Sequence, residues 1–399
     1  MTSNAERIRL AYRRDSLRQP GQQQGERIIL VFELFVGIAL VAVVLYDVFE
    51  TVVVPRRTGR FLRLSPQIVT WLWPIWRRYG VRLHPAWRRE DFLGTFAPLV
   101  LVLLLFMWEV SLIVGFGLVM HALQDQIDPK PADFSSAFYF SGASLLTIGY
   151  GDIVPLGVAA RTAALMAGAS GLAVVALVIS LTFNLYTSFA RREVFVLILD
   201  SRAGVPPSGV MMLETFGRYK IIDELAPSFA QFELWTAEML DSHLAYPILP
   251  FFRSSHDGQS WVSALGAVLD AATLLITAIP ADPSNDSDIL RKSRASAEMM
   301  YGVGVHALVD ITQLMRGRLD KLIPDVPGIE QAEFETACRR LAAAGYPTID
   351  RAKSWPVFAQ LRAKYASRLN MLARYLAAPP TQWIGDRTIL LDRHAGPHF

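Results

Sequence analysis

The residues with the most distinctive chemistry form the consecutive run Thr147 to Asp152, which reads Thr-Ile-Gly-Tyr-Gly-Asp. Its two glycines, Gly149 and Gly151, stand at alternate positions and allow backbone conformations that a side chain would penalise. Successive carbonyl groups can then point the same way and replace the water shell of a dehydrated cation. The run therefore predicts ion coordination by backbone oxygens.

The segments around this run predict how it is positioned. The stretch from Asp133 to Leu146 is long enough for a helix that crosses half a membrane, with Asp133 as its N-cap. On either side lie two apolar stretches, Phe96 to Leu123 and Val158 to Ala190, each long enough to cross a hydrocarbon layer of ~30 Å. Irregular backbone at that depth is tolerated only where it is buried in protein and lines water. The half-helix would also direct the partial negative charge of its C-terminus toward the cation.

In this order of elements, the run resembles the selectivity filter of potassium channels, and residues 96–190 resemble the two-helix pore module of prokaryotic potassium channels. The resemblance implies a filter formed by Thr147, Ile148, Gly149, Tyr150, Gly151 and Asp152. It implies that K⁺ binds transiently to the carbonyl oxygens of the first four of these residues and to the Thr147 hydroxyl. Ile148 and Tyr150 would pack outward against the pore helix and hold the width of the filter. Because an ion needs carbonyls from all sides and each chain has one filter, four copies would surround one pore.

The same resemblance implies roles for residues of the third span. Arg161 matches a basic residue early in the family's inner helix, and Gly171 matches the glycine of its gating hinge. Gly168 could share that role, and either glycine could instead permit close helix packing. Residues one helical turn apart would face the lower pore, with Phe183 as the narrow hydrophobic gate. These residues are Ile179, Phe183 and Thr187.

A few positions depart from the family's pattern. Leu146 stands where many members carry a hydroxyl group, and Ala143 provides no carboxyl group behind the filter for Asp152. Tyr139 and Phe140 stand where a tryptophan pair is common. These differences bear on inactivation and filter stiffness rather than on selectivity.

The composition indicates a membrane protein with an additional span. Of the 399 residues, 52% are hydrophobic and only 19% are charged, which is too apolar for an ordinary soluble protein. A third apolar stretch, Ile28 to Val54, is longer than the core of a signal peptide and has no small-residue cleavage site after it. Residues 1–27 are polar and predict a flexible N-terminus. The one cysteine, Cys338, predicts a free thiol.

Charges flanking the spans predict their orientation. Residues 55–95 hold nine arginines against Glu90 and Asp91, which predicts a cytoplasmic loop. The segment 124–133 is acidic and suits the outer side, whereas Arg191 and Arg192 suit the inner side. These assignments place the N-terminus outside, although residues 1–27 contain six arginines. We therefore expect a multi-pass protein of the inner (plasma) membrane.

Within the basic loop, Leu64 to Trp76 is too short to span the membrane and carries Trp71, Trp73 and Trp76. This pattern favours a helix that lies in the membrane interface, with a re-entrant or buried segment as the alternative. The arginines lie beside the apolar stretches rather than in a separate patch, so contact with a membrane surface is favoured over nucleic acid.

The C-terminal half, residues 191–399, changes to amphipathic segments separated by prolines. Apolar residues recur at helical spacing in Phe229 to Leu244, Trp261 to Ile279, Ile289 to Leu314, Ile329 to Leu341 and Phe358 to Leu376. This half predicts a helical, soluble, cytoplasmic domain. Asp270 in the middle of the most apolar segment favours a buried core helix over a further span.

Several other polar residues are candidate sites. Glu33 and Glu109 lie inside predicted spans, where carboxylates are costly and suggest sensing; protonation, or a hydrogen bond from a neighbouring serine or tyrosine, is the favoured alternative. Asp47 and Glu50 suit anchors near the inner end of the first span, where Arg56 and Arg57 could pair with them. Caps and turn contacts are favoured over a metal site for a histidine and aspartate group in the C-terminal half. That group consists of Asp241, His243, His256 and Asp257.

Together these features predict an all-α protein with five parts: a flexible segment 1–27, an extra span 28–54, a basic loop 55–95, a pore module 96–190 and a helical domain 191–399. The expected function is passive, potassium-selective conduction by a homotetramer, with no catalysis and no cofactor. A membrane-anchored sensor or scaffold with a vestigial pore is the alternative, and a potassium transporter subunit is a third possibility. No phosphate-binding glycine loop or arginine-repeat voltage sensor is recognisable, so the gating ligand or partner is unknown.

Overall fold

The computed structural model describes residues 20–54, 64–255, 258–279, 288–315, 329–347 and 351–383. This part of the chain is almost entirely helical, as predicted. Its contacts divide it into two compact units. The membrane unit contains residues 20–54, 64–65 and 101–182, and the C-terminal unit contains residues 66–100 and 183–383 as far as they are described.

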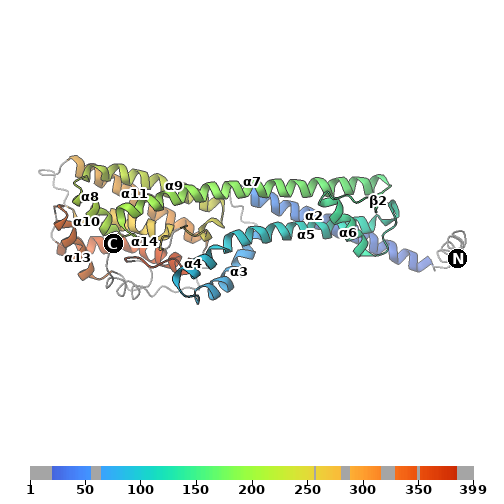
Figure 1. The fold of residues 1–399 in the computed structure, drawn as a ribbon, viewed down its shortest axis with the longest axis horizontal. Helices are drawn as coiled ribbons and strands as arrows, with labels where there is room; N and C mark the ends of the chain where they lie inside the picture. The colour runs from blue at the N-terminus through green and yellow to red at the C-terminus, as the bar shows by residue number, and fades with distance from the viewer. Residues whose placement is uncertain are drawn as a thin grey trace. The chain divides into compact units, whose positions relative to one another are not determined.

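The membrane unit is built from three long helices and one short one (Figure 1). The long helices are α2 (Pro20–Val52), α5 (Phe96–Ala122) and α7 (Val158–Ala203), and the short one is α6 (Phe134–Leu145). Between α5 and α6 lie η1 (Gln124–Gln126) and the strand β1 (Ile127–Asp128), which pairs antiparallel with β2 (Val154–Pro155). α2 begins before Ile28, and α7 continues past Ala190 as one helix that contributes to both units.

Helices α2 and α5 run antiparallel. This is seen from their contacts, since residues early in one helix contact residues late in the other. His121 Nδ1 lies 2.6 Å from Glu33 Oε2, and Trp108 Nε1 donates a 2.8 Å hydrogen bond to Asp47 Oδ2. Between these contacts the helices approach closely, since a Cβ atom on Gly37 would lie 2.6 Å from the Gly115 carbonyl oxygen. Small residues permit this approach, as is usual for helices in membranes.

The C-terminal unit is a helical bundle whose elements largely follow the predicted amphipathic segments. They are α3 (Leu64–Gly80), α4 (Ala86–Gly94), α8 (Gly209–Arg218), η2 (Ile222–Glu224), α9 (Leu225–Ala245), η3 (Leu249–Phe251), α10 (Trp261–Ala278), α11 (Asp288–Leu314), α13 (Gln331–Ala343) and α14 (Arg351–Leu376). The sequence analysis missed α8, a short helix whose N-cap Ser208 accepts a hydrogen bond from the Met211 amide. The unit also takes in residues 66–100, which precede the pore module in the chain.

Helix α10 lies at the centre of this bundle. Four helices of the described chain are long and apolar enough to cross a membrane, and α10 is one of them, but 94% of its apolar window is buried within the protein. Asp270 accepts hydrogen bonds from Arg362 Nε at 3.0 Å and from the Tyr365 hydroxyl at 2.6 Å. A buried carboxylate is tolerated where its charge is paired in this way. The prediction of a buried core helix accords with this packing.

Candidate pore and selectivity filter

The pore candidate begins with α6, which is fixed at its start by its N-cap. The Asp133 carboxylate accepts hydrogen bonds of 2.9 Å from both the amide and the hydroxyl of Ser136. Further along, the Ser141 hydroxyl donates a 2.9 Å bond to the Ile113 carbonyl oxygen and joins α6 to α5. The helix ends at Leu145, directly before the predicted filter.

The filter backbone alternates in conformation. Thr147, Gly149 and Gly151 have φ angles of 56°, 59° and 78°, in the left-handed region. A Cβ atom on either glycine would meet nothing within 4 Å, so the requirement for glycine is conformational rather than spatial. Alternation of this kind allows successive carbonyl groups to point toward one side, which is the arrangement that coordinates a dehydrated cation.

The start of the filter is tied to the end of α6. The Ala143 carbonyl oxygen accepts hydrogen bonds from the amides of Ile148 at 2.9 Å and Gly149 at 3.3 Å, and the Thr147 amide donates to the Ser144 carbonyl oxygen at 3.1 Å. The last turn of α6 therefore determines where the filter begins.

The far end of the filter is held by a contact that sequence reasoning missed. The Tyr139 hydroxyl donates a 2.9 Å hydrogen bond to Asp152 Oδ2, and its ring stacks on that of Tyr150 with an interplanar angle of 4°. Ala143 has no carboxyl group to offer here, and Tyr139 supplies a hydroxyl instead. The signal was available, because Tyr139 occupies one of the positions at which the sequence departs from the family's tryptophan pair.

A short frame supports the segment after the filter. β2 pairs with β1, and the Leu156 amide donates a 2.8 Å bond to the Gln126 carbonyl oxygen. A Cβ atom on Gly157 would lie 2.2 Å from Gln126 Oε1, so a side chain at this position would require the Gln126 side chain to move. Arg161 Nε donates to the Pro155 carbonyl oxygen at 3.1 Å, which ties the start of α7 to the same frame.

The two candidate hinge glycines pack against the end of α6. A Cβ atom on Gly171 would lie 2.2 Å from the Leu145 carbonyl oxygen, and one on Gly168 would lie 3.2 Å from that of Ser144. Helix α7 is unbroken through both positions. This geometry favours the close-packing interpretation for Gly171, and the hinge remains a prediction for another conformation.

The three candidate gate residues lie one turn apart on α7, as their spacing requires. Ile179 and Phe183 are 53% and 70% exposed in the single chain, and Thr187 is exposed as well. The Thr187 hydroxyl donates a 2.9 Å bond to the Phe183 carbonyl oxygen. The chain therefore presents a row of exposed side chains at these positions, two of them apolar.

Of the two carboxylates inside predicted spans, only one has a partner among the residues that the structure describes. Glu33 contacts His121, as given above, whereas both carboxylate oxygens of Glu109 are buried without a hydrogen bond. Asp47 and Glu50 receive hydrogen bonds from Trp108 and Tyr46. Pairs of these acids with Arg56 or Arg57 would lie outside the described residues.

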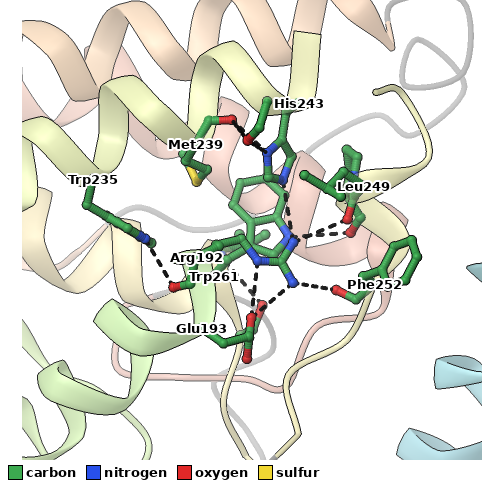
Figure 2. A network of polar contacts seen from close by, with 12 residues as sticks. Arg192, Glu193, Trp235, Met239, His243, Leu249, Phe252 and Trp261 are labelled. Carbon is green, nitrogen blue, oxygen red and sulfur yellow. Dashed lines mark hydrogen bonds and ion pairs between the residues drawn. The ribbon is translucent and has the colours of Figure 1, made fainter. Parts of the chain in front are cut away.

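Beyond the predicted gate, α7 is anchored in the C-terminal unit by Arg192, which is 2% exposed (Figure 2). Its guanidinium group donates to the carbonyl oxygens of Leu249 at 3.2 Å and Phe252 at 2.7 Å and pairs with Glu193 at 3.0 Å. The Trp235 indole donates to the Arg192 carbonyl oxygen at 3.1 Å. This polar network fixes the extension of the inner helix to α9 and η3.

His243 completes this network. Its Nδ1 lies 2.7 Å from the Met239 carbonyl oxygen and its Nε2 lies 3.5 Å from Arg192 Nη1. Burial, together with the charge of Arg192, lowers the pKa of His243 well below the usual value. Within the described residues no group of three or more histidine, cysteine, aspartate or glutamate side chains could hold a metal ion. His256 and Asp257 of the group considered above lie outside those residues.

Comparison with known proteins agrees with this geometry. Residues 104–188 match a family model described as "Ion channel", so the pore segment supports an ion channel. The chain is 22% identical to the "Uncharacterized membrane protein YdjJ" of Bacillus subtilis (strain 168) over 254 residues, which cover 59% of this chain and 74% of that protein. No solved structure matches the chain significantly. The apolar helices and this relative together indicate a membrane protein.

Proposed function

We propose that the chain is the subunit of a homotetrameric, potassium-selective channel that conducts K⁺ passively. The observation that carries the proposal is the left-handed backbone at Thr147, Gly149 and Gly151, held at the C-terminal end of α6. Each chain provides one such strand, and a cation needs oxygens on all sides. Tyr150 is 70% exposed in the single chain, which accords with a filter that is completed by further copies.

The proposed orientation places the filter on the outer side of the inner membrane and the C-terminal unit in the cytoplasm. The basic loop 55–95 and the acidic segment 124–133 support this arrangement. Antiparallel packing of α2 and α5 then puts the N-terminus outside. The channel needs no cofactor and catalyses no reaction, because the ion's electrochemical gradient drives transport.

The C-terminal unit is proposed to gate the pore. The support for this role is that α7 continues from the filter side into the anchor around Arg192 without a break. A rearrangement of α9 or η3 would therefore act on the same helix that carries Phe183.

Flux from proteoliposomes tests the proposal. The purified chain should pass K⁺ in preference to Na⁺ and be blocked by Ba²⁺. Gly149→Ala should abolish flux because a side chain disfavours the left-handed backbone there, whereas Gly302→Ala should not. Equal permeation of both cations would refute selectivity, and an absence of flux from folded protein would favour a scaffold.

A further inference from the structure

Helix α3 has two faces of different character. Val69, Trp73 and Gly80 are buried, and with Trp76 they follow one another at helical spacing. On the opposite face Trp71, Ile75 and Tyr79 are 69%, 57% and 60% exposed. These three residues, spaced four apart, are called the α3 stripe below.

The buried face of α3 caps the end of α14. Trp73 Nε1 donates a 3.0 Å hydrogen bond to the Tyr375 carbonyl oxygen, and Arg77 donates to that of Arg374 at 2.8 and 3.1 Å. The last carbonyl groups of a helix have no partner within the helix, and cationic donors there also oppose the negative end of its dipole. The Trp73 ring packs edge-on against Phe251 at 5.0 Å. The buried face of α3 therefore packs within the C-terminal unit.

A second contact strengthens this attachment. Arg253 donates to the carbonyl oxygens of Leu376 at 2.8 Å and Ala377 at 2.7 Å, and its Nε donates to Glu90 of α4 at 2.6 Å. Trp76 stacks on Phe92 of α4 with ring centroids 4.6 Å apart. Helices α3 and α4 thus form one layer on the end of α14, and that layer presents the α3 stripe outward.

The stripe and its surroundings have the composition of a membrane interface. Exposed arginines accompany it, namely Arg78, Arg82 and Arg88, and α3 itself contains no acidic residue. Tryptophan and tyrosine partition to the headgroup level of a bilayer, and arginines beside them are attracted to anionic lipids. Trp87 of α4 extends this aromatic and basic surface. It is half exposed, and the Arg88 guanidinium group lies 5.0 Å from its ring centroid.

Helix α3 is tethered at both ends to helices that are long and apolar enough to cross a membrane. Residues 53–63 separate it from α2, and residues 81–95, which include α4, separate it from α5. Because a chain extends by at most about 3.6 Å per residue, the shorter connection limits the distance of α3 from the end of α2 to about 40 Å. An exposed aromatic stripe on this tether can reach lipid.

We propose that the α3 stripe binds the surface of a bilayer that contains anionic phospholipid. Trp71, Ile75 and Tyr79 enter the headgroup region while the neighbouring arginines contact lipid phosphates. The opposite face of α3 holds the C-terminal end of α14, so the helix attaches the C-terminal unit to the membrane surface. This proposal concerns membrane attachment, and it holds or fails independently of ion conduction.

Spin labels on the full-length chain test this surface. In a Cys338→Ala background, cysteines are introduced by Trp71→Cys and Ile75→Cys, with the 58% exposed Met299→Cys of α11 as control. Each variant is reconstituted in phosphatidylcholine vesicles with or without phosphatidylglycerol. Labels at 71 and 75 should collide more with oxygen than with a water-soluble nickel chelate, and the label at 299 should show the reverse. Phosphatidylglycerol should increase the difference, and adding Arg78→Gln with Arg82→Gln should remove that increase.

Three results would overturn the proposal. Labels at 71 and 75 that are as accessible to nickel as the label at 299 would show that the stripe faces water. Exclusion of both reagents, together with dipolar coupling between labels of neighbouring subunits, would show that a second copy covers it. Insertion that is unaffected by phosphatidylglycerol would show that anionic lipid is not recognised. Because collision rates report depth whether or not ions pass, failure here is distinguishable from failure of the channel proposal.

Discussion

At the scale of single residues, the proposed filter depends on a few groups that cannot be exchanged for similar ones. Gly149 and Gly151 are required by their backbone angles, whereas Gly171 is required by the space beside the Leu145 carbonyl group. Tyr139 provides a hydrogen-bond donor behind the filter that holds Asp152. Substitutions at these positions therefore separate conformational, steric and hydrogen-bonding contributions.

We expect Tyr139→Phe to weaken the filter without removing it. The change deletes the hydrogen bond to Asp152, and a bond of this kind contributes about 1 kcal/mol, or roughly fivefold in an equilibrium. The K⁺ concentration needed to sustain half of the flux should rise about fivefold. Proteoliposome flux over a K⁺ series measures this, with the 69% exposed Tyr219 as the control in Tyr219→Phe. Equal values for both variants would show that the Tyr139 contact does not support the filter.

Gly171→Ala should destabilise the pore more than Gly168→Ala. The added Cβ atom would lie 2.2 Å from a backbone oxygen at position 171 but 3.2 Å from one at position 168. Overpacking of this kind costs roughly 1 to 3 kcal/mol. Thermal unfolding of the reconstituted protein should rank the variants in that order, with Gly302→Ala as a control that meets no atom within 4 Å. If Gly171→Ala unfolds like the control, the close packing is wrong.

At the scale of elements, α7 is the helix on which the pore and the C-terminal unit both depend. Its filter end contacts the end of α6, and its last turns are held by the Arg192 network (Figure 2). In that network His243 donates from Nδ1 to the Met239 carbonyl oxygen, which leaves Nε2 as the acceptor toward Arg192. A proton on Nε2 would place two buried cations side by side.

The anchor should therefore weaken in acid. Because burial and Arg192 lower the pKa of His243, the unfolded chain binds a proton below pH 6.5 that the folded chain does not. The free energy of unfolding contributed by His243 is complete above pH 6.5. It then falls by up to about 1.4 kcal/mol for each pH unit below that value until the pKa of the folded state is reached.

Melting temperatures between neutral and mildly acidic pH measure this effect. His243→Gln keeps a donor and an acceptor but cannot titrate, so it should reduce the dependence on pH. His306→Gln is the control, because His306 has a 69% exposed side chain and lies outside the Arg192 network. The same slope in all three proteins would show that His243 is not the titrating group.

At the scale of the whole molecule, the exposed residues of one subunit predict assembly. Ile179, Phe183 and Tyr150 are all at least half exposed in the single chain, and in the proposed tetramer Ile179 and Phe183 would face the shared pore. The subunit is therefore expected to be incomplete by itself.

Native mass spectrometry of the detergent-solubilised protein should give particles of four 44.4 kDa chains. Phe183→Asp should preserve this mass but change the flux, because it places a charge in the proposed hydrophobic constriction. Leu234→Asp, at a 59% exposed position of α9, is the matched control. Monomeric particles from the unaltered chain would contradict a shared pore.

The sequence by itself determined the class of the fold and where the proposed filter lies in the chain. A long apolar segment in a membrane can form few structures, because its backbone groups must be hydrogen-bonded internally. Gly149 and Gly151 indicate a left-handed backbone, and this can be recognised from the sequence. The amphipathic periods of α9, α10, α11, α13 and α14 likewise follow from local spacing. Helix α8 was not predicted, because it is too short to show a clear helical period in sequence.

Only the tertiary structure decided the contacts between residues far apart in the chain. The pairing of Asp152 with Tyr139, of Glu33 with His121 and of Arg192 with Phe252 depends on which helix faces join. Helix α3 shows the same division: its tryptophans were visible in sequence, but Trp73 packs against Phe251 whereas Trp71 remains exposed. Periodicity identifies which residues share a face, and packing alone determines what that face contacts.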